Sequence, residues 1–123
     1  MKYTSTSKAP GAIGPYSQAI SVNGFLYTSG QIALDPDTGN IAGDTIAEQT
    51  EQACKNLQAV LEANDLDFSK VVKTTCFLSD MSYFASFNEV YAKYFISKPA
   101  RSCVAVKTLP KNVLCEIELI AVL

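Results

Sequence analysis

The only arginine of the chain, Arg101, lies in the segment Pro99-Ala-Arg-Ser-Cys103, where a predicted strand begins. A guanidinium group presents its N–H donors as a planar fork that matches the two oxygens of a carboxylate. Arg101 is therefore the strongest candidate for binding an organic acid. An isolated arginine is also common on protein surfaces, so residue type and position leave both interpretations open.

Two acidic residues, Glu116 and Glu118, are spaced two apart in an apolar segment near the end of the sequence. Residues at this spacing in a strand point to the same face of the sheet. A carboxyl group among apolar neighbours has a raised pKa and can act as a general base. A solvated pair at a strand edge has the same spacing, and that interpretation stays open too.

Three further positions carry polar groups suited to a binding site. Asn88 lies on the aromatic face of a predicted helix, where a buried amide must be hydrogen-bonded, either to a ligand or to nearby backbone. Tyr16, in a Gly-Pro-Tyr-Ser turn, has an aromatic ring with a polar tip, which suits a ligand, an interface or a packed turn. Ser29 and Gly30 end a strand, and glycine there allows another group to approach the backbone closely.

Several classes of function are disfavoured by what the sequence lacks. Without histidine, the usual Ser-His and Cys-His mechanisms are excluded, and a catalytic metal is not expected. A net charge of -2 with a single arginine gives no support for a nucleic-acid partner. The four cysteines form no C-x-x-C pair, which predicts buried free thiols. No apolar run is long enough for a membrane span and no signal peptide begins the sequence, so we expect a cytoplasmic protein.

The patterning predicts one domain, residues 1–123, in which strands and helices alternate. Strands 18–22 and 25–29 flank Asn23-Gly24, a strong hairpin signal. A Thr45-x-x-Glu48 capping box opens a first helix, and Asn64-Asp65 ends it. The residues expected on the inner face of this helix are Ile46, Ala53, Leu57, Val60 and Leu61.

A β-branched apolar strand, 71–78, comes next, followed by a second helix from Asp80 or Ser82 to about Phe95. The inner face of the second helix is expected to carry Phe84, Phe87, Tyr91 and Phe95. Two final strands, 102–108 and 114–122, are joined by a turn region at 109–112. The predicted fold class is α+β, a mixed sheet with two helices on one face.

The last strand predicts an oligomer. Its residues Cys115, Ile117, Leu119 and Ala121 should face the helices. The opposite face is expected to carry Leu114, Ile120 and Val122 beside the two glutamates, with Val104 and Val106 added from a neighbouring strand. A sheet face without helices is usually polar, so an apolar one indicates a covering subunit.

Taken together, these segments resemble the RidA (YjgF-type) family of reactive intermediate deaminases. The matching pieces occur in the order of the family and cover essentially the whole chain. They are Ala12-Ile-Gly-Pro-Tyr-Ser-Gln18, Thr28-Ser-Gly-Gln-Ile32, Thr74-Thr75 with Phe77, Phe87-Asn-Glu-Val-Tyr91, Pro99-Ala-Arg-Ser-Cys-Val104, Leu109-Pro-Lys and Glu116-Ile-Glu118.

The resemblance implies a chorismate-mutase-like fold in a homotrimer with clefts between subunits. It implies hydrolysis of 2-aminoacrylate, 2-aminocrotonate and their imine tautomers to 2-oxo acids, which protects pyridoxal phosphate enzymes, and it implies no cofactor for this protein itself.

Carried over residue by residue, Arg101 would hold the substrate carboxylate and Glu116, rather than Glu118, would position the attacking water. The backbone carbonyl of Cys103 would be the second contact of that water. Tyr16, Ser29, Gly30 and Asn88 would line the cleft, with Tyr16 reaching in from a neighbouring subunit.

The same resemblance leaves other functions open. A non-catalytic protein could bind 2-oxo acids in the same cleft as a regulator. RNA cleavage and a chaperone-like surface role are further alternatives. The presence of both Arg101 and Glu116 favours catalysis, because binding a carboxylate requires only the arginine.

Overall fold

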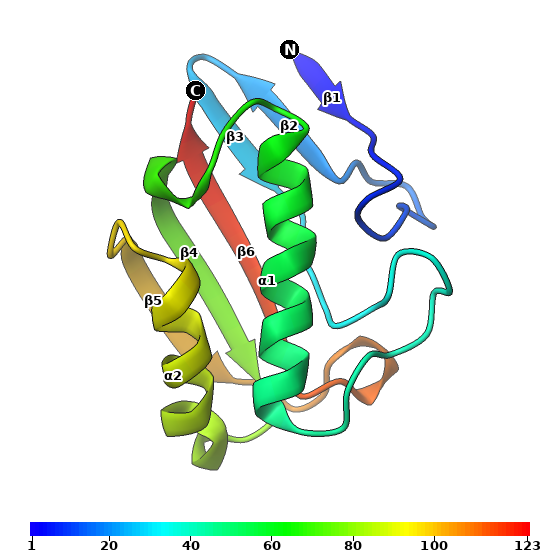
Figure 1. The fold of residues 1–123 in the computed structure, drawn as a ribbon, viewed down its shortest axis with the longest axis vertical. Coiled ribbons are helices and arrows are strands. Elements are labelled where there is room, and N and C mark those ends of the chain that lie inside the picture. Colours follow the sequence, from blue (N-terminus) through cyan, green and yellow to red (C-terminus); the bar gives the residue numbers. More distant parts are fainter.

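In the computed structural model, which describes residues 1–123, six strands form one mixed sheet and two α-helices cover one of its faces (Figure 1). The strands are β1 (Lys2–Thr4), β2 (Ala19–Val22), β3 (Phe25–Thr28), β4 (Val71–Leu78), β5 (Ala100–Ala105) and β6 (Cys115–Val122). The helices are α1 (Ile46–Glu62) and α2 (Phe84–Tyr94). The strand order is β1-β2-β3-β6-β4-β5, and only the β4–β5 pair is parallel. The predicted α+β class is confirmed.

The hairpin between β2 and β3 forms where Asn23-Gly24 predicts it. Both turn residues have positive φ, 51° for Asn23 and 84° for Gly24, which is the backbone of a tight two-residue turn. Val22 pairs with Phe25 directly across it. Strand β1 was not expected, because three residues are too few to show a pattern. It pairs with β2 at the edge of the sheet.

Helix α1 begins at the predicted capping box. The Thr45 side chain accepts a hydrogen bond from the Glu48 backbone N–H at 3.2 Å, and the Glu48 carboxylate accepts one from the Thr45 backbone N–H at 3.2 Å. After the helix, Asp65 has a φ of 58°, which turns the chain away. All five residues predicted for the inner face are buried.

Helix α2 starts later than its first cap suggests. Asp80 caps a 3-10 turn, Met81–Tyr83, and the α-helix begins only at Phe84. The expected inner face is largely confirmed: Phe87, Tyr91 and Phe95 are buried, and Phe84 is half-buried.

Strand β5 differs from the prediction in extent and in neighbour. It runs from Ala100 to Ala105, not from 102 to 108. Ala105 pairs with Leu78, the last residue of β4, so the residues after Ala105 have no strand to pair with. The connection through α2 makes β5 a parallel neighbour of β4, so β4 separates it from β6. Val104 therefore lies two strands away from β6, on the face of the sheet away from the helices, and Val106 lies beyond the end of β5.

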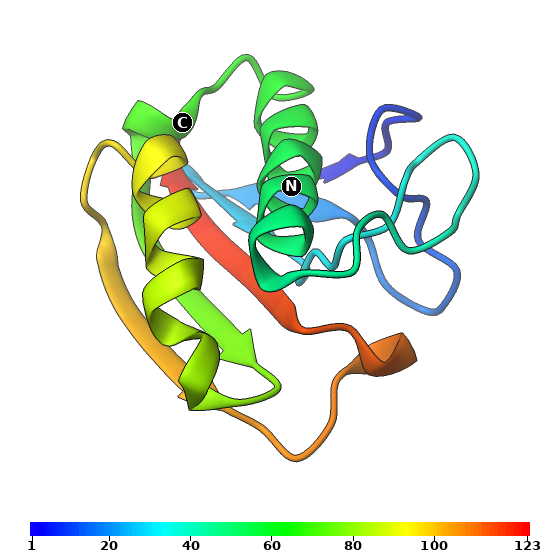
Figure 2. The ribbon, with the colours of Figure 1, turned by 60° about the horizontal axis from the view of Figure 1, so that its bottom comes forward.

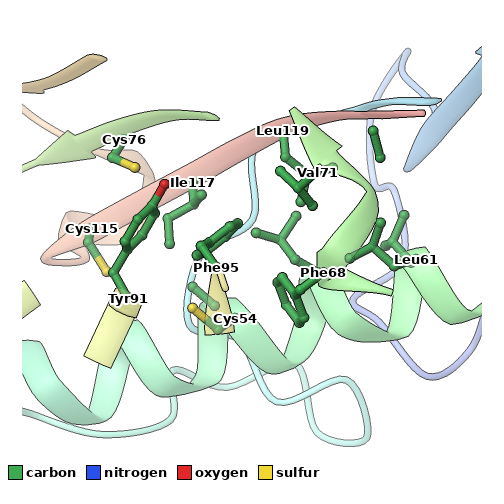
Figure 3. Close-up of a cluster of buried hydrophobic side chains, with 14 of the residues drawn as sticks. Cys54, Leu61, Phe68, Val71, Cys76, Tyr91, Phe95, Cys115, Ile117 and Leu119 are labelled. Carbon is green, nitrogen blue, oxygen red and sulfur yellow. The ribbon is translucent and has the colours of Figure 1, made fainter. Parts of the chain in front are cut away.

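The core lies between the helices and the sheet (Figure 3). Cys115, Ile117, Leu119 and Ala121 of β6 face the helices as predicted and are all at most 2% exposed. Leu114 was placed on the opposite face, but it precedes β6 and packs against the core. All four cysteines are free; Cys103 is only half-buried, which corrects the expectation that all would be buried.

The face of the sheet away from the helices is partly apolar, and Figure 2 shows no helix covering it. Its exposed large side chains include Tyr3, Phe25, Tyr27, Val104 and Val122, between 38% and 60% exposed. We call this surface the open face. Neither helix is both long and apolar enough to cross a bilayer. The cytoplasmic location stays a prediction.

Candidate functional site

Arg101 lies on edge strand β5 with its side chain on the helix side of the sheet. Its register partner on β4 is Thr74, which is fully buried beneath the helices. The guanidinium carbon lies 4.7 Å from the ring centre of Tyr91 and 5.4 Å from that of Phe84. Its Nη1 donates a hydrogen bond to Asn88 Oδ1 at 2.8 Å. Arg101 is thus half-buried in an aromatic setting, not a freely exposed arginine.

No acidic side chain neutralises Arg101. The one ion pair in the chain joins Lys93 and Glu51 on the helices. Two aromatic faces and an amide oxygen hold the guanidinium without cancelling its charge. Arg101 and Asn88 border an open groove of about 540 Å³, which Tyr91, Phe95 and Pro99 also line. An organic carboxylate is the kind of ligand that such an uncompensated fork attracts.

Cys103 is two residues further along the same edge strand. The Val106 N–H donates to the Leu78 carbonyl at 2.9 Å, so by alternation the backbone N–H and C=O of Cys103 point away from β4. The side chain points inward and packs against the core, and burial raises the pKa of its thiol. The carbonyl, not the thiol, is the polar group that Cys103 presents at the edge.

Glu116 lies near the start of β6, on the open face. It pairs with Phe77 of β4, whose neighbours Cys76 and Leu78 are both fully buried on the other face. Burial raises the pKa of the Glu116 carboxyl, and the nearby charge of Glu118 adds to the rise. Glu116 is therefore better suited to accept a proton near neutral pH than an ordinary solvated glutamate.

Gly30 lies against the side chain of Glu116. A methyl group added at Gly30 would sit 2.8 Å from Glu116 Cδ and 3.1 Å from Oε2. The contact arises because Gln31 and Ile117 exchange backbone hydrogen bonds at 2.8 and 3.1 Å, which holds the segment after β3 beside β6. Gly30 is thus required for the close approach of the carboxylate.

Ser29 and Tyr16 are linked through the turn that carries the tyrosine. The Ser29 hydroxyl donates to the Ser17 carbonyl at 2.6 Å, and the Ser29 N–H donates to the Gln18 carbonyl at 2.9 Å. Tyr16 is 52% exposed on this turn. Together with Gly30 and Glu116, Tyr16 lines a cavity of about 380 Å³. The Ser29 side chain positions the turn and does not line the cavity.

Two buried amides that the sequence analysis did not single out hold the walls of this cavity. Asn56 of α1 donates to the carbonyls of Ile32 and Leu34 at 3.0 and 2.9 Å. Gln18 donates to the Pro10 carbonyl at 2.9 Å and accepts from the Thr6 N–H at 2.7 Å. The signal for Asn56 was present, because an amide among the inner positions of an amphipathic helix must find buried partners.

The candidate residues fall into two groups within one chain. Arg101 and Asn88 border the groove at α2 and β5, whereas Tyr16, Gly30 and Glu116 border the cavity formed by the loops on the other side of the molecule. The two pockets share no residue, and β4 separates the strands of Arg101 and Glu116. Figures 1 and 2 both show α2 and β5 on the side opposite the N-terminal and 30–45 loops.

Comparison with known proteins extends over nearly the whole chain. The sequence model of the endoribonuclease L-PSP family matches residues 6–123. The human 2-iminobutanoate/2-iminopropanoate deaminase is 49% identical over 119 residues, covering 96% of this chain and 87% of the human protein. A candidate regulator of Lactococcus lactis, AldR, is 55% identical over 122 residues, 98% of this chain and 97% of its own. The solved structure of Escherichia coli TdcF with bound serine has a TM-score of 0.94 and 42% identity, with 100% and 99% of the chains covered.

Proposed function

The chain belongs to the endoribonuclease L-PSP family, the family of RidA and YjgF proteins, and on that premise we propose that it hydrolyses 2-imino and 2-enamino acids to 2-oxo acids and ammonia. The substrates are 2-iminobutyrate, 2-iminopropionate and their enamine tautomers. Removing these electrophiles would protect pyridoxal phosphate enzymes. The activity named for the human relative supports this reaction.

The observation that carries the proposal is the state of Arg101. It is the only arginine, it has no acidic partner, and it borders an open groove. A half-buried cation without a counter-ion is costly unless a ligand supplies the charge. The serine bound to TdcF, a relative of the same fold, also carries a carboxylate.

The proposed reaction needs only positioning and one base. The fork of Arg101 binds the carboxylate of the substrate and fixes the plane of the imine. Glu116 and the Cys103 carbonyl hold a water molecule, whose oxygen attacks the imine carbon while Glu116 takes a proton. The imine nitrogen gains a proton as the carbinolamine forms. A second proton on that nitrogen makes ammonia the leaving group, and the hydroxyl proton is lost as the C–N bond breaks and the C=O bond of the 2-oxo acid forms. Water and imine are thus converted to ketone and ammonia without a redox step.

We propose that a second copy of the chain completes the site. Arg101 and Glu116 extend from opposite faces of the sheet, so one copy supplies one half of the cleft and its neighbour supplies the other half. The apolar open face offers the surface for this association. A closed ring of three such contacts would be a homotrimer with equivalent clefts between the subunits.

The test couples the protein to a threonine dehydratase, which releases the imine, in the presence of semicarbazide, which traps it. The wild type should outcompete the trap and raise the yield of free 2-oxobutyrate. Arg101→Ala and Glu116→Gln should both lose this effect. Lys93→Ala, which removes an exposed cation of α2 instead, serves as the matched control and should behave as wild type. An active Arg101→Ala variant would disprove the proposed role of the arginine.

A second candidate function rests on the similarity to AldR. A regulator would bind a 2-oxo acid in the same cleft and would not turn over an imine. The wild type would then fail the trapping assay but still bind 2-oxobutyrate in a calorimetric titration. The family description also names ribonuclease activity, but a net charge of -2 and a single arginine give RNA little to bind.

A further inference from the structure

We infer that Tyr91, held in place by Thr74, is a positioning residue that fixes the guanidinium of Arg101 in the orientation needed to receive a carboxylate. The inference rests on the proposed function for its consequence, but its geometry is independent of any ligand. Neither residue was expected to be functional from the sequence, which placed Tyr91 in the core and gave Thr74 no role.

The Tyr91 ring packs against two aromatic rings and the guanidinium of Arg101. Phe95 stacks on it with the ring centres 4.2 Å apart and the planes inclined by 18°. Phe87 packs against the ring at 5.7 Å between centres, and the guanidinium carbon of Arg101 lies over the ring, 4.7 Å from its centre. A cation over a phenol ring is attracted by the negative potential of the ring face. The ring is therefore a fixed support for Arg101.

The hydroxyl end of Tyr91 is held as well. Its oxygen lies 2.7 Å from Thr74 Oγ1 in a buried hydrogen bond, and Figure 3 shows the hydroxyl pointing from α2 toward the sheet. Thr74 is fully buried and is the register partner of Arg101 on the adjacent strand. The same position on β4 thus lies beside Arg101 in the sheet and holds the hydroxyl of the ring that supports its side chain.

Together with Asn88, this arrangement leaves the guanidinium little freedom. Asn88 and Tyr91 are three residues apart on α2 and present to one side of the helix. Asn88 Oδ1 accepts from one terminal nitrogen of the guanidinium, Nη1, while the Tyr91 ring packs against the guanidinium plane. The remaining donors stay available for a ligand, and no charge is lost because neither partner is an anion. A preorganised fork binds a carboxylate without the entropy cost of ordering a flexible arginine.

The sole arginine gives a direct readout. In protein labelled with ¹⁵N only at arginine, the side-chain Nε–Hε group produces one signal, which reports the position of Arg101 whether or not a ligand binds. In the wild type we expect a signal shifted by the aromatic ring currents, with the relaxation of a rigid group. Tyr91→Leu should move it toward the position of a free arginine and make the group more mobile, although Phe84 and Asn88 remain as contacts.

Two milder variants keep the test valid if Tyr91→Leu does not fold. Tyr91→Phe keeps the ring and removes the hydroxyl, and Thr74→Val removes the other partner of the same hydrogen bond. Each should shift the Arg101 signal partway, and the double variant should equal the single ones because both break one contact. Tyr94→Phe is the matched control, since its hydroxyl donates to Glu51 away from Arg101. Unchanged Arg101 signals in all Tyr91 and Thr74 variants would overturn the inference.

The functional half of the inference is tested by titration with 2-oxobutyrate and with its neutral amide. Loss of the ring contact should weaken binding of the carboxylate about ten-fold and leave binding of the amide unchanged. An equal loss for both ligands would indicate general damage and would overturn the positioning role. A wild type that binds neither ligand would count against the proposed function, whereas the Arg101 signal would still decide the geometry.

Discussion

The side chain of Glu116 lies so close to the backbone of Gly30 that no larger residue fits at position 30 without moving the carboxylate. An alanine at position 30 would place its methyl group 2.8 Å from Glu116 Cδ, and the carboxylate would have to move. A displacement of about 1 Å in a catalytic group can cost about a hundred-fold in rate. We therefore expect Gly30→Ala to lower kcat in the imine assay by about that factor while the melting temperature changes little.

Combining Gly30→Ala with Glu116→Ala tests whether the loss of activity arises from the displaced carboxylate. In Glu116→Ala protein the methyl group has no carboxylate to displace, so adding Gly30→Ala should lower the residual activity no further. An additional hundred-fold loss in that background would show that Gly30 acts through some other contact.

The titration of Glu116 gives a second prediction at this scale. Glu118 raises the pKa of the Glu116 carboxyl through its negative charge, so Glu118→Gln should lower that pKa. Because the proposed base is Glu116 in its ionised form, the activity of the variant should persist to lower pH. The measurement is kcat/KM against pH, with sedimentation to verify an unchanged assembly. As a control, Glu89→Gln makes the same charge change on the exposed side of α2 and should leave the acid limb of the pH profile in place. Identical pH profiles for Glu118→Gln and Glu89→Gln would contradict the proposal that Glu116 is the base.

Residue types alone pointed to Arg101, to the pair Glu116 and Glu118, and to Asn88, because few side chains have the charge or the amide needed for such roles. The choice of Glu116 over Glu118 came from the family resemblance. The contacts of these side chains were harder to predict from the sequence. Asn88 was expected to bind a ligand or the backbone, yet its Oδ1 accepts from Arg101. The Ser29 hydroxyl donates to the Ser17 carbonyl, a contact that was not expected, and its place in the cleft stays a prediction. Such contacts join segments far apart in the sequence, and no local pattern specifies them.

At the scale of elements, the predictions succeeded where a local signal is strong. The hairpin at Asn23-Gly24 and the capping box at Thr45 are short motifs whose side chains and backbone angles decide the structure within four residues. The place of β5 was not predictable in this way. Its neighbour is set by the path of the chain through α2, and only the folded structure shows that β4 lies between β5 and β6.

The capping box provides the prediction for α1. Thr45→Ala removes the side chain that accepts from the Glu48 N–H and should lower the free energy of unfolding by about 1 kcal/mol. Hydrogen bonds from Thr45 also lower the pKa of the Glu48 carboxyl in the folded protein. The stability that the capping box contributes is therefore fully present above the pKa of a glutamate in the unfolded chain, and it is lost as the pH falls through the lower pKa of the folded protein. Urea unfolding at neutral and acid pH measures both effects. A Thr45→Ala penalty as large at acid pH as at neutral pH would show that Glu48 takes no part.

At the scale of the whole molecule, the apolar open face and the division of the site have one common explanation. The sequence predicted the apolar face from the alternation in β6, which includes Val122, and from Val104; Tyr27 of the neighbouring strand β3 extends it. It did not predict that Arg101 and Glu116 would point to opposite sides of the sheet. We call Arg101 with Asn88 the arginine half of the site, and Glu116 with Gly30 and Tyr16 the glutamate half. An assembly that covers the open face and joins the arginine half of one copy to the glutamate half of another would account for both features.

This assembly predicts that two inactive variants restore activity when they share an oligomer. Arg101→Ala retains an intact glutamate half, and Glu116→Gln retains an intact arginine half. Co-expressed with different affinity tags and purified on both, they should form mixed trimers in which one cleft combines the two intact halves. The activity should be about one third of the wild type, because a closed ring of three with both variants contains one such junction.

The matched control places both substitutions in the same half. Mixed oligomers of Arg101→Ala and Asn88→Ala can never contain an intact arginine half, because every copy carries one of the two changes. They should therefore stay at the activity of the better single variant. If the Arg101→Ala and Glu116→Gln mixture also remains inactive while the mixed oligomers form, each site must lie within one copy. A closure that brings β5 and β6 residues together inside a single chain would then be required, and the open face would have some other partner.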